Sequence, residues 1–234
     1  MRTENLDYRD EQGAAYVGYL ARPDQPNGAA VLIAHGAPGL SDHERQTAER
    51  LAGLGFVAFA ADYHGKGEIL VSPALEARVG PLMQDTRALR APMRAALAAL
   101  AAQDGVDPNR IAAIGYCMGG AAVFELACAG AEVKAVIGFH SLLPTQHPED
   151  FTAIKGAVLM LQGSNDPYAP QDARLAFAKH MDAAGADWRI VLYGGVQHGF
   201  TMPEFGSQGR PGIVYHERAD KRSWRAMLDA LGEV

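Results

Sequence analysis

Short apolar runs alternate along the chain with longer segments in which apolar residues recur every three or four positions. The short runs are typical of buried strands, and the longer segments have the period of amphipathic helices. This alternation predicts an α/β fold, in which a mostly parallel sheet carries helices on both faces. The predicted core strands are Ala30 to Ala34, Phe56 to Ala61, Ile111 to Ile114, Val133 to Phe139, Ala157 to Leu161 and Arg189 to Tyr193, with Ala15 to Leu20 as an added antiparallel edge strand.

Helices are predicted from their apolar stripes and their end signals. Ser41 and Glu44 form a capping box ahead of a helix that is expected to stop at Gly55. In the next helix, Pro92 is expected to bend the helix or to mark a fresh start. The stripes predicted to face the core are Ala48, Leu51 and Leu54, then Leu82, Leu89, Met93, Leu97 and Leu100, then Ala173, Phe177 and Met181, and finally Trp224, Met227, Leu228 and Leu231.

The chain has 234 residues, of which 48% are hydrophobic and 21% are charged. These values are typical of one soluble globular domain, so residues 1–234 are predicted to form a single domain. No linker rich in Pro, Gly or Ser divides the sequence. The irregular stretches 64–78, 141–151 and 201–212 are predicted to be loops that cap a site.

The charges are scattered along the chain and sum to −6, which argues against nucleic acid as a partner. No segment approaches the roughly 20 uninterrupted apolar residues of a membrane span, and the first residues are too charged for the core of a signal peptide. The expected location is the cytoplasm, with no membrane partner. The two cysteines, Cys117 and Cys128, are too far apart along one helical stretch to form a disulfide.

The most informative segment runs from Ile111 to Ala121, as a strand, a Gly-x-Cys-x-Gly turn and a helix start rich in small residues. This is the pattern of a nucleophile elbow, with cysteine as the nucleophile. The glycines are needed because the helix packs close behind a strained turn. The helix N-terminus would favour the thiolate of Cys117. Cys128, within the helix, is predicted to be an inert packing thiol.

A cysteine nucleophile of this type is followed along the chain by an acid and then by a histidine. Asp166 lies in a polar turn after the strand that ends near Leu161, and His198 lies in a glycine-flanked turn after the next strand. Alone, Asp166 reads as the start of an Asx turn, and His198 reads as a solvated loop residue. Together they predict a Cys117–His198–Asp166 catalytic triad.

Acyl transfer also needs amide groups that stabilise the tetrahedral oxyanion. The strand that ends near Ala34 is followed by His35-Gly36-Ala37-Pro38. Because Pro38 has no N–H, Ala37 is the predicted donor in this loop, together with the amide of Met118. His35 is predicted to brace the loop.

At these residues the chain resembles the dienelactone hydrolase family of α/β-hydrolases. The matching segments are Gly115 to Gly120, Asp166 with Pro170, His198 to Phe200, Asp62 to Gly65 and Arg222 to Trp224. The resemblance implies an α/β-hydrolase fold and a thiol hydrolase whose partner is a small-molecule ester or lactone, with no cofactor and no metal. Tyr63, His64 and Phe200, which lie in matching segments, are the predicted substrate contacts.

The sequence departs from the family members that open dienelactones. At the place of their gating glutamate, this chain has Gly36. The arginines with which those members hold a substrate carboxylate have no evident counterpart in Arg78, Arg87 or Arg210. These departures favour a broader carboxylic-ester substrate.

Other classes of protein make different use of the same residues. A redox-sensing or ligand-binding module would use Cys117 on a hydrolase scaffold, but such a module needs neither Asp166 nor an oxyanion loop. A metal-dependent hydrolase would use some of the eight histidines, which form no His-x-x-x-His pair. The predicted mechanism is therefore attack by Cys117 on an ester or lactone carbonyl, with an acyl-enzyme intermediate. The sequence leaves the oligomeric state open.

Overall fold

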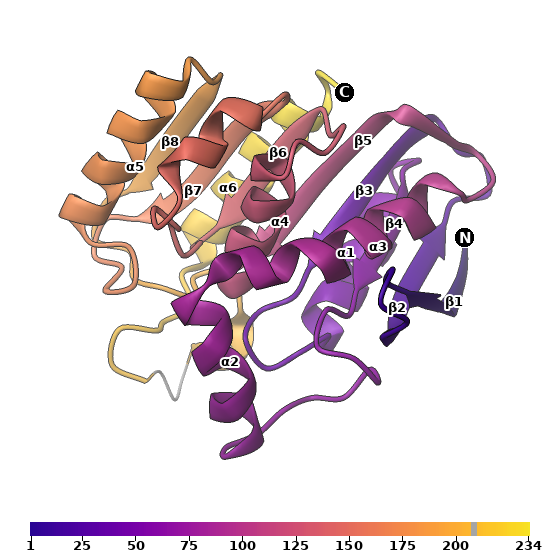
Figure 1. Cartoon of the computed structure of the whole chain (residues 1–234), viewed down its shortest axis with the longest axis horizontal. Helices are drawn as coiled ribbons and strands as arrows, with labels where there is room; N and C mark the ends of the chain where they lie inside the picture. Colours follow the sequence, from indigo (N-terminus) through magenta and orange to yellow (C-terminus); the bar gives the residue numbers. More distant parts are fainter. Residues whose placement is uncertain (207–209) are drawn as a thin grey trace.

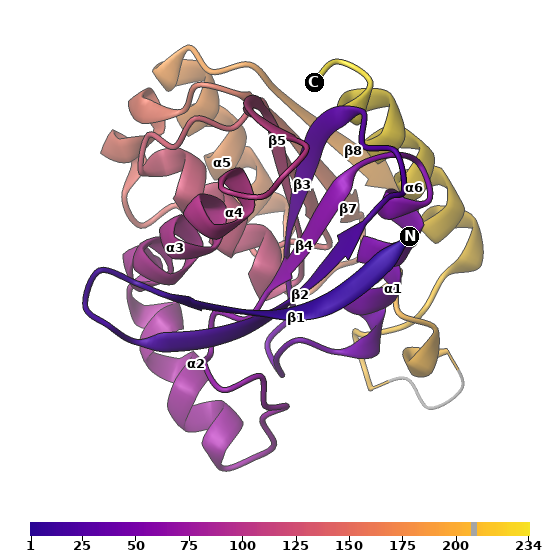
Figure 2. The ribbon, with the colours of Figure 1, turned by 90° about the vertical axis from the view of Figure 1, so that its right-hand side faces the viewer.

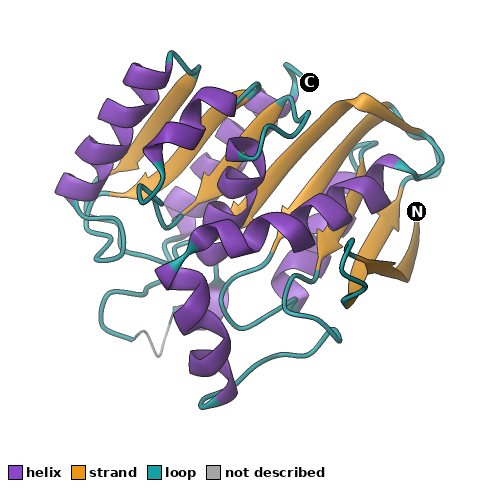
Figure 3. Cartoon of the chain, viewed as in Figure 1, coloured by secondary structure: helices purple, strands orange, loops and turns teal. Residues whose placement is uncertain are grey.

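The computed structural model describes residues 1–206 and 210–234. Its strands form one eight-stranded sheet in the order β1-β2-β4-β3-β5-β6-β7-β8 (Figures 1 and 3). The bounds are β1 Arg2–Arg9, β2 Ala15–Arg22, β3 Gly28–Ala34, β4 Val57–Ala61, β5 Val106–Tyr116, β6 Ala135–Phe139, β7 Ala157–Gly163 and β8 Trp188–Tyr193.

The strands β3 to β8 pair in parallel, and β2 pairs antiparallel with both of its neighbours. The predicted mostly parallel sheet is therefore confirmed, and Ala15 to Leu20 is an antiparallel strand as expected. The edge itself is formed by β1, which the apolar pattern did not predict. Most side chains of β1 are exposed, so it has no apolar run. Its pairing with β2 places it in the sheet.

Helices cover both faces of the sheet, as Figure 2 shows from the side. One face is covered by α3, α4 and α5, and the other by α1 and α6, each through a buried apolar stripe. The helical elements are α1 Asp42–Ala52, α2 Ala74–Gln84, η1 Thr86–Leu89, α3 Arg90–Ala101, α4 Met118–Cys128, η2 Pro148–Ala153, α5 Gln171–Ala184, η3 Pro203–Phe205 and α6 Glu217–Leu231, the η elements being 3₁₀ turns.

The predicted end of the first helix is wrong, and the predicted second helix is divided. The capping box at Ser41 and Glu44 is present, but α1 ends at Ala52, before Gly55, and Leu54 beyond its end is 51% exposed. The predicted second helix is divided at Asp85, and a fresh helix, α3, begins at Arg90, so Pro92 marks a new start, as one of the two alternatives predicted, and does not bend a longer helix. The Asp85 side chain accepts the N–H of Arg87 and starts a new turn, while Pro92 lies in the first turn of α3, where proline is tolerated.

The helix α2 lies apart from these two layers, beyond the carboxyl ends of the parallel strands (Figures 1 and 3). Only Leu82 of this helix is buried. Among the described residues, no helix combines the length and the apolar character that crossing a membrane requires. The carboxyl ends of the strands are where side chains from several strands converge in α/β sheets.

Candidate active site

The nucleophile elbow predicted at Cys117 has the expected geometry. Cys117 lies between β5 and α4 with φ of +55°, a conformation that is strained for a residue other than glycine. A Cβ at Gly115 would lie 2.1 Å from the Gly119 carbonyl oxygen, and a Cβ at Gly119 would lie 2.2 Å from that of Ala34. Glycine is therefore required at both positions, because β3, β5 and α4 approach one another closely here.

Asp166 and His198 meet at the carboxyl ends of β7 and β8. The Nδ1–H of His198 donates to Oδ2 of Asp166 at 2.8 Å, and both side chains are buried. The other carboxylate oxygen, Oδ1, accepts the backbone N–H of Tyr168 at 2.8 Å. Asp166 is thus held in place from two sides and fixes the orientation of the imidazole.

His198 and Cys117 line the same cavity, and the charge of Cys117 affects the pKa of His198. Burial alone lowers the pKa of His198, but the charge of Cys117 and hydrogen bonds with Asp166 and Cys117 outweigh burial and raise the pKa to about 10. His198 therefore carries a proton at neutral pH when it faces the thiolate. Bonding of Nδ1 to Asp166 leaves Nε2 to exchange a proton with Cys117.

The two predicted oxyanion donors, Ala37 and Met118, border the same cavity as Cys117. Met118 is the first residue of α4, and the N–H of a first helical residue has no partner inside its helix. The Nε2–H of His64 donates to the Ala37 carbonyl at 2.7 Å, which orients the Ala37 backbone. Ala37 and Met118 therefore lie at the same cavity as Cys117, and their role as oxyanion donors stays a prediction.

His35 stabilises the loop after β3, as predicted. Its carbonyl accepts the Tyr63 hydroxyl at 2.7 Å, and the His35 and Tyr63 rings stack with centroids 3.8 Å apart. The Asp62 carboxylate accepts the backbone N–H groups of His64, Gly65 and Gly67. The segment after β4 is thus tied to the loop after β3.

A cavity of about 330 Å³ opens over Cys117 and His198. Each of the three predicted cap stretches contributes to its wall, although residues 207–209 of the third lie outside the described residues. The stripe Leu75, Val79 and Met83 shows that α2 turns one face toward the cavity. Apolar side chains dominate the wall, chiefly Leu75, Val79, Met83, Leu142, Met202 and Phe205.

The three predicted substrate contacts do not line this cavity, so the structure does not support that prediction. Tyr63 and Phe200 are completely buried, and Tyr63 packs under His35. His64 is held between Ala37 and Arg78, and burial lowers the pKa of its ring to about 4, so it is neutral. These side chains are buried or half-buried and do not face the cavity. The actual wall residues come from α2 and the cap stretches, which carry no local motif.

Of the three arginines considered as ligands for a substrate carboxylate, one lines the cavity and two do not. Arg210 lines the cavity. Arg78 is held outside it, because its guanidinium donates to the Tyr63 carbonyl at 2.7 Å and to Nδ1 of His64 at 3.3 Å. Arg87, in η1, does not line the cavity and pairs with Glu149 and Asp150.

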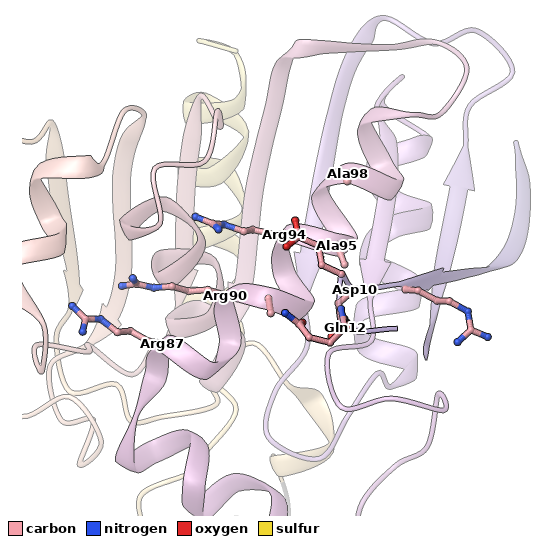
Figure 4. A pocket seen from close by; sticks show the side chains of 10 residues that line it. Asp10, Gln12, Arg87, Arg90, Arg94, Ala95 and Ala98 are labelled. Atoms are coloured by element: carbon pink, nitrogen blue, oxygen red, sulfur yellow. Dashed lines mark hydrogen bonds between the residues drawn. The ribbon is translucent and has the colours of Figure 1, made fainter. Parts of the chain in front are cut away.

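A second hollow of about 360 Å³ lies between α3 and the turn that joins β1 to β2 (Figure 4). Four arginines border it, but Figure 4 shows the heads of Arg87 and Arg90 directed away from the hollow. Arg90 pairs with Glu125 and Asp150, and Arg87 pairs with Asp150. Carboxylates therefore neutralise these two cations.

Cys128 differs from Cys117 in its surroundings. Its side chain is buried at the end of α4, and burial strongly raises the pKa of its thiol. A buried thiol of this kind stays protonated and unreactive. Its surroundings are those of the packing residue that was predicted.

A mostly parallel sheet, a strained turn at Cys117 between β5 and α4, and a hydrogen-bonded acid and histidine after β7 and β8 are features of the α/β-hydrolase fold. Residues 16–234 match the sequence model of the dienelactone hydrolase family, and the chain belongs to that family. It is a hydrolase of the ester or lactone type.

Several relatives illustrate this membership. A carboxymethylenebutenolidase from a Pseudomonas species is 26% identical over 194 residues, which cover 78% of this chain and 79% of the relative. The solved structure of a protein named m3DLH superposes with a TM-score of 0.94 at 38% identity, covering 100% of this chain and 98% of the other. A dienelactone hydrolase-like promiscuous phosphotriesterase from metagenomic libraries has a TM-score of 0.91 at 34% identity, covering 99% and 98% of the two chains.

Proposed function

We propose that this protein hydrolyses carboxylic esters and lactones through a Cys117–His198–Asp166 triad and an acyl-enzyme intermediate. The observation that carries the proposal is that the side chains of Cys117, His198 and Asp166 lie close together at one site. The strained Cys117 and the His198 ring border one cavity, and His198 is hydrogen-bonded to a buried Asp166 at 2.8 Å. These contacts support the roles of nucleophile for Cys117, base for His198 and orienting acid for Asp166.

The proposed reaction has two halves. The thiol proton of Cys117 passes to Nε2 of His198, and the sulfur attacks the carbonyl carbon while the amides of Ala37 and Met118 stabilise the oxyanion. Collapse of the tetrahedral intermediate breaks the ester C–O bond, and His198 gives its proton to the departing alkoxide. Water, deprotonated by His198, then attacks the thioester and releases the acid, and the proton returns to Cys117.

Initial rates on neutral aryl esters, lactones and thioesters test this proposal. We expect turnover of aryl esters and lactones by the purified protein without any added cofactor. Binding of these compounds without hydrolysis would favour the alternative, a redox-sensing or ligand-binding module that uses Cys117.

Hydrolysis of neutral phosphotriesters is a second candidate function. A solved relative at 34% identity is named for that activity, and a Cβ at Gly36 would have no atom closer than 3.8 Å. A phosphoryl centre carries one more substituent than an acyl carbon, and the absence of a side chain at Gly36 leaves more room beside Cys117 than another residue would. We expect the protein to hydrolyse diethyl para-nitrophenyl phosphate. A preparation that is active on para-nitrophenyl acetate but inert on this compound would exclude the second function.

Gly36→Glu tests whether the departure at this position governs substrate choice. A Cβ at this position would have no atom closer than 3.8 Å, and the added carboxylate would lie beside Cys117, where it would repel the thiolate. We expect the rate on neutral esters to fall by about tenfold or more, with no gain of dienelactone hydrolysis. Paired kinetics on an aryl acetate and a dienelactone measure this.

Gly36→Gln is the matched control, because it adds nearly the same volume without the charge. We expect it to retain more esterase activity than Gly36→Glu. A glutamate variant that opens dienelactones and keeps its esterase rate would contradict the assignment of a broader ester substrate.

A further inference from the structure

The ring of His140 packs against the ring of His198, and the proposed reaction does not use it. The two ring centroids are 4.9 Å apart, with an angle of 67° between the planes, so one ring meets the other edge to face. His140 directly follows β6 and is completely buried. On another side of His198, the Tyr168 ring lies with its centroid 4.7 Å away. The catalytic imidazole therefore has two aromatic neighbours.

The backbone at His140 is strained in the same way as that of the nucleophile. Its φ is +37°, so it shares with Cys117 a positive φ that is rare outside glycine. The chain around it is bonded to Cys117 on both sides, because the Cys117 N–H donates to the Phe139 carbonyl at 3.0 Å and the Leu142 N–H donates to the Cys117 carbonyl at 3.3 Å. The turn that holds the nucleophile therefore also places the His140 ring on His198.

His140 stays neutral in this position. Burial lowers its pKa well below the ordinary value, and the charges of His198 and of His43, which comes from α1, lower it further. Its Nε2 lies 2.8 Å from the hydroxyl of Thr201, and its Nδ1 has no hydrogen-bond partner among the described residues. Of two adjacent imidazoles, only His198 has a carboxylate partner, so His198 takes the proton.

We infer that His140 is a positioning residue, which keeps the His198 ring aligned between Asp166 and Cys117 and favours its protonated form through a neutral aromatic contact. This inference rests on the proposed function, because it assigns His140 a part in the work of His198. A cation over the face of an aromatic ring within about 6 Å of its centroid is stabilised by that ring, and the His198 and His140 centroids are 4.9 Å apart in an edge-to-face arrangement. A misaligned base lowers the rate of proton transfer and leaves substrate binding unchanged.

Two substitutions distinguish the effect of the His140 ring from the effect of the backbone conformation at this position. His140→Asn keeps a residue that tolerates positive φ but removes the ring from His198. His140→Phe keeps an aromatic ring at the same place but loses the bond to Thr201. Melting curves and near-ultraviolet circular dichroism establish that each variant is folded. The readouts are kcat and KM on an aryl ester, and the titration of the His198 ring followed by NMR, which needs no turnover.

We expect His140→Asn to lower kcat by about tenfold or more with KM within about twofold of wild type, and to shift the His198 titration to lower pH. His140→Phe should keep kcat within about threefold of wild type. The inference is overturned if the asparagine variant keeps its kcat, if the His198 titration does not move, or if the phenylalanine variant loses as much as the asparagine variant. Absence of ester turnover in the wild type would instead reject the proposed function, while the NMR titration would still report on His140.

Discussion

Replacing Cys117 with alanine is expected to abolish ester turnover and leave the fold intact. Alanine keeps the Cβ of the strained residue, and the lost sulfur faces the cavity, so little packing is removed. Without the sulfur no acyl-enzyme can form. Steady-state ester hydrolysis and a melting curve measure the two parts of this prediction.

The chain provides a matched control in its second cysteine. Cys128→Ala removes a buried thiol at the other end of α4, so it should cost some stability but keep ester turnover. Residual activity of Cys117→Ala within about tenfold of wild type, which corresponds to only about 1.4 kcal/mol of barrier, would mean that the nucleophile is misassigned.

Replacing Asp166 with asparagine is expected to lower kcat by about 10³–10⁴-fold. The asparagine carbonyl can still accept the Tyr168 N–H, which leaves the amide NH₂ facing Nδ1 of His198. An NH₂ group cannot accept a hydrogen bond from Nδ1–H, so the imidazole would adopt the tautomer with its proton on Nε2. That tautomer cannot take a proton from Cys117.

Asp166→Ala provides the comparison, because it removes the acceptor without forcing the wrong tautomer. We expect the alanine variant to be impaired but to retain at least as much activity as the asparagine variant. Kinetics over a range of pH, with folding checked by circular dichroism, distinguish the two. An asparagine variant within about tenfold of wild type would argue against Asp166 as the orienting acid.

The sequence alone predicts the elements that rest on local chemistry. The elbow at Cys117 is recognisable because close packing allows only glycine at positions 115 and 119. The acid and the histidine are recognisable because each follows a strand, and those two strands are neighbours in the sheet. The sheet and its helical layers are likewise visible in the apolar periodicity. Local constraints of this kind leave a direct trace in the residue pattern.

Features that depend on tertiary packing leave no such trace. The strand β1 is mostly exposed, so its polar sequence resembles a loop until it pairs with β2. Part of the wall of the cavity comes from α2, whose residues Leu75, Val79 and Met83 belong to no motif and to none of the predicted stripes. Tyr63 and Phe200 were predicted as substrate contacts because they lie in matching segments, but burial makes them supports.

His140 is an intermediate case. Its position directly after the strand that ends at Phe139 places it at the sheet edge where functional side chains converge, so the signal was present in the sequence. Its contact with His198 depends on a turn with positive φ, which the sequence does not reveal for a histidine.

The most direct test of the proposed mechanism is detection of the acyl group on Cys117. Wild-type protein mixed with an excess of an aryl ester is quenched in acid during turnover, and its peptides are analysed by mass spectrometry. The proposed mechanism predicts the acyl mass on the peptide that contains Cys117, none on the peptide that contains Cys128, and none in Cys117→Ala. Turnover that proceeds with no acyl mass on Cys117, or with the label on another residue, would contradict it.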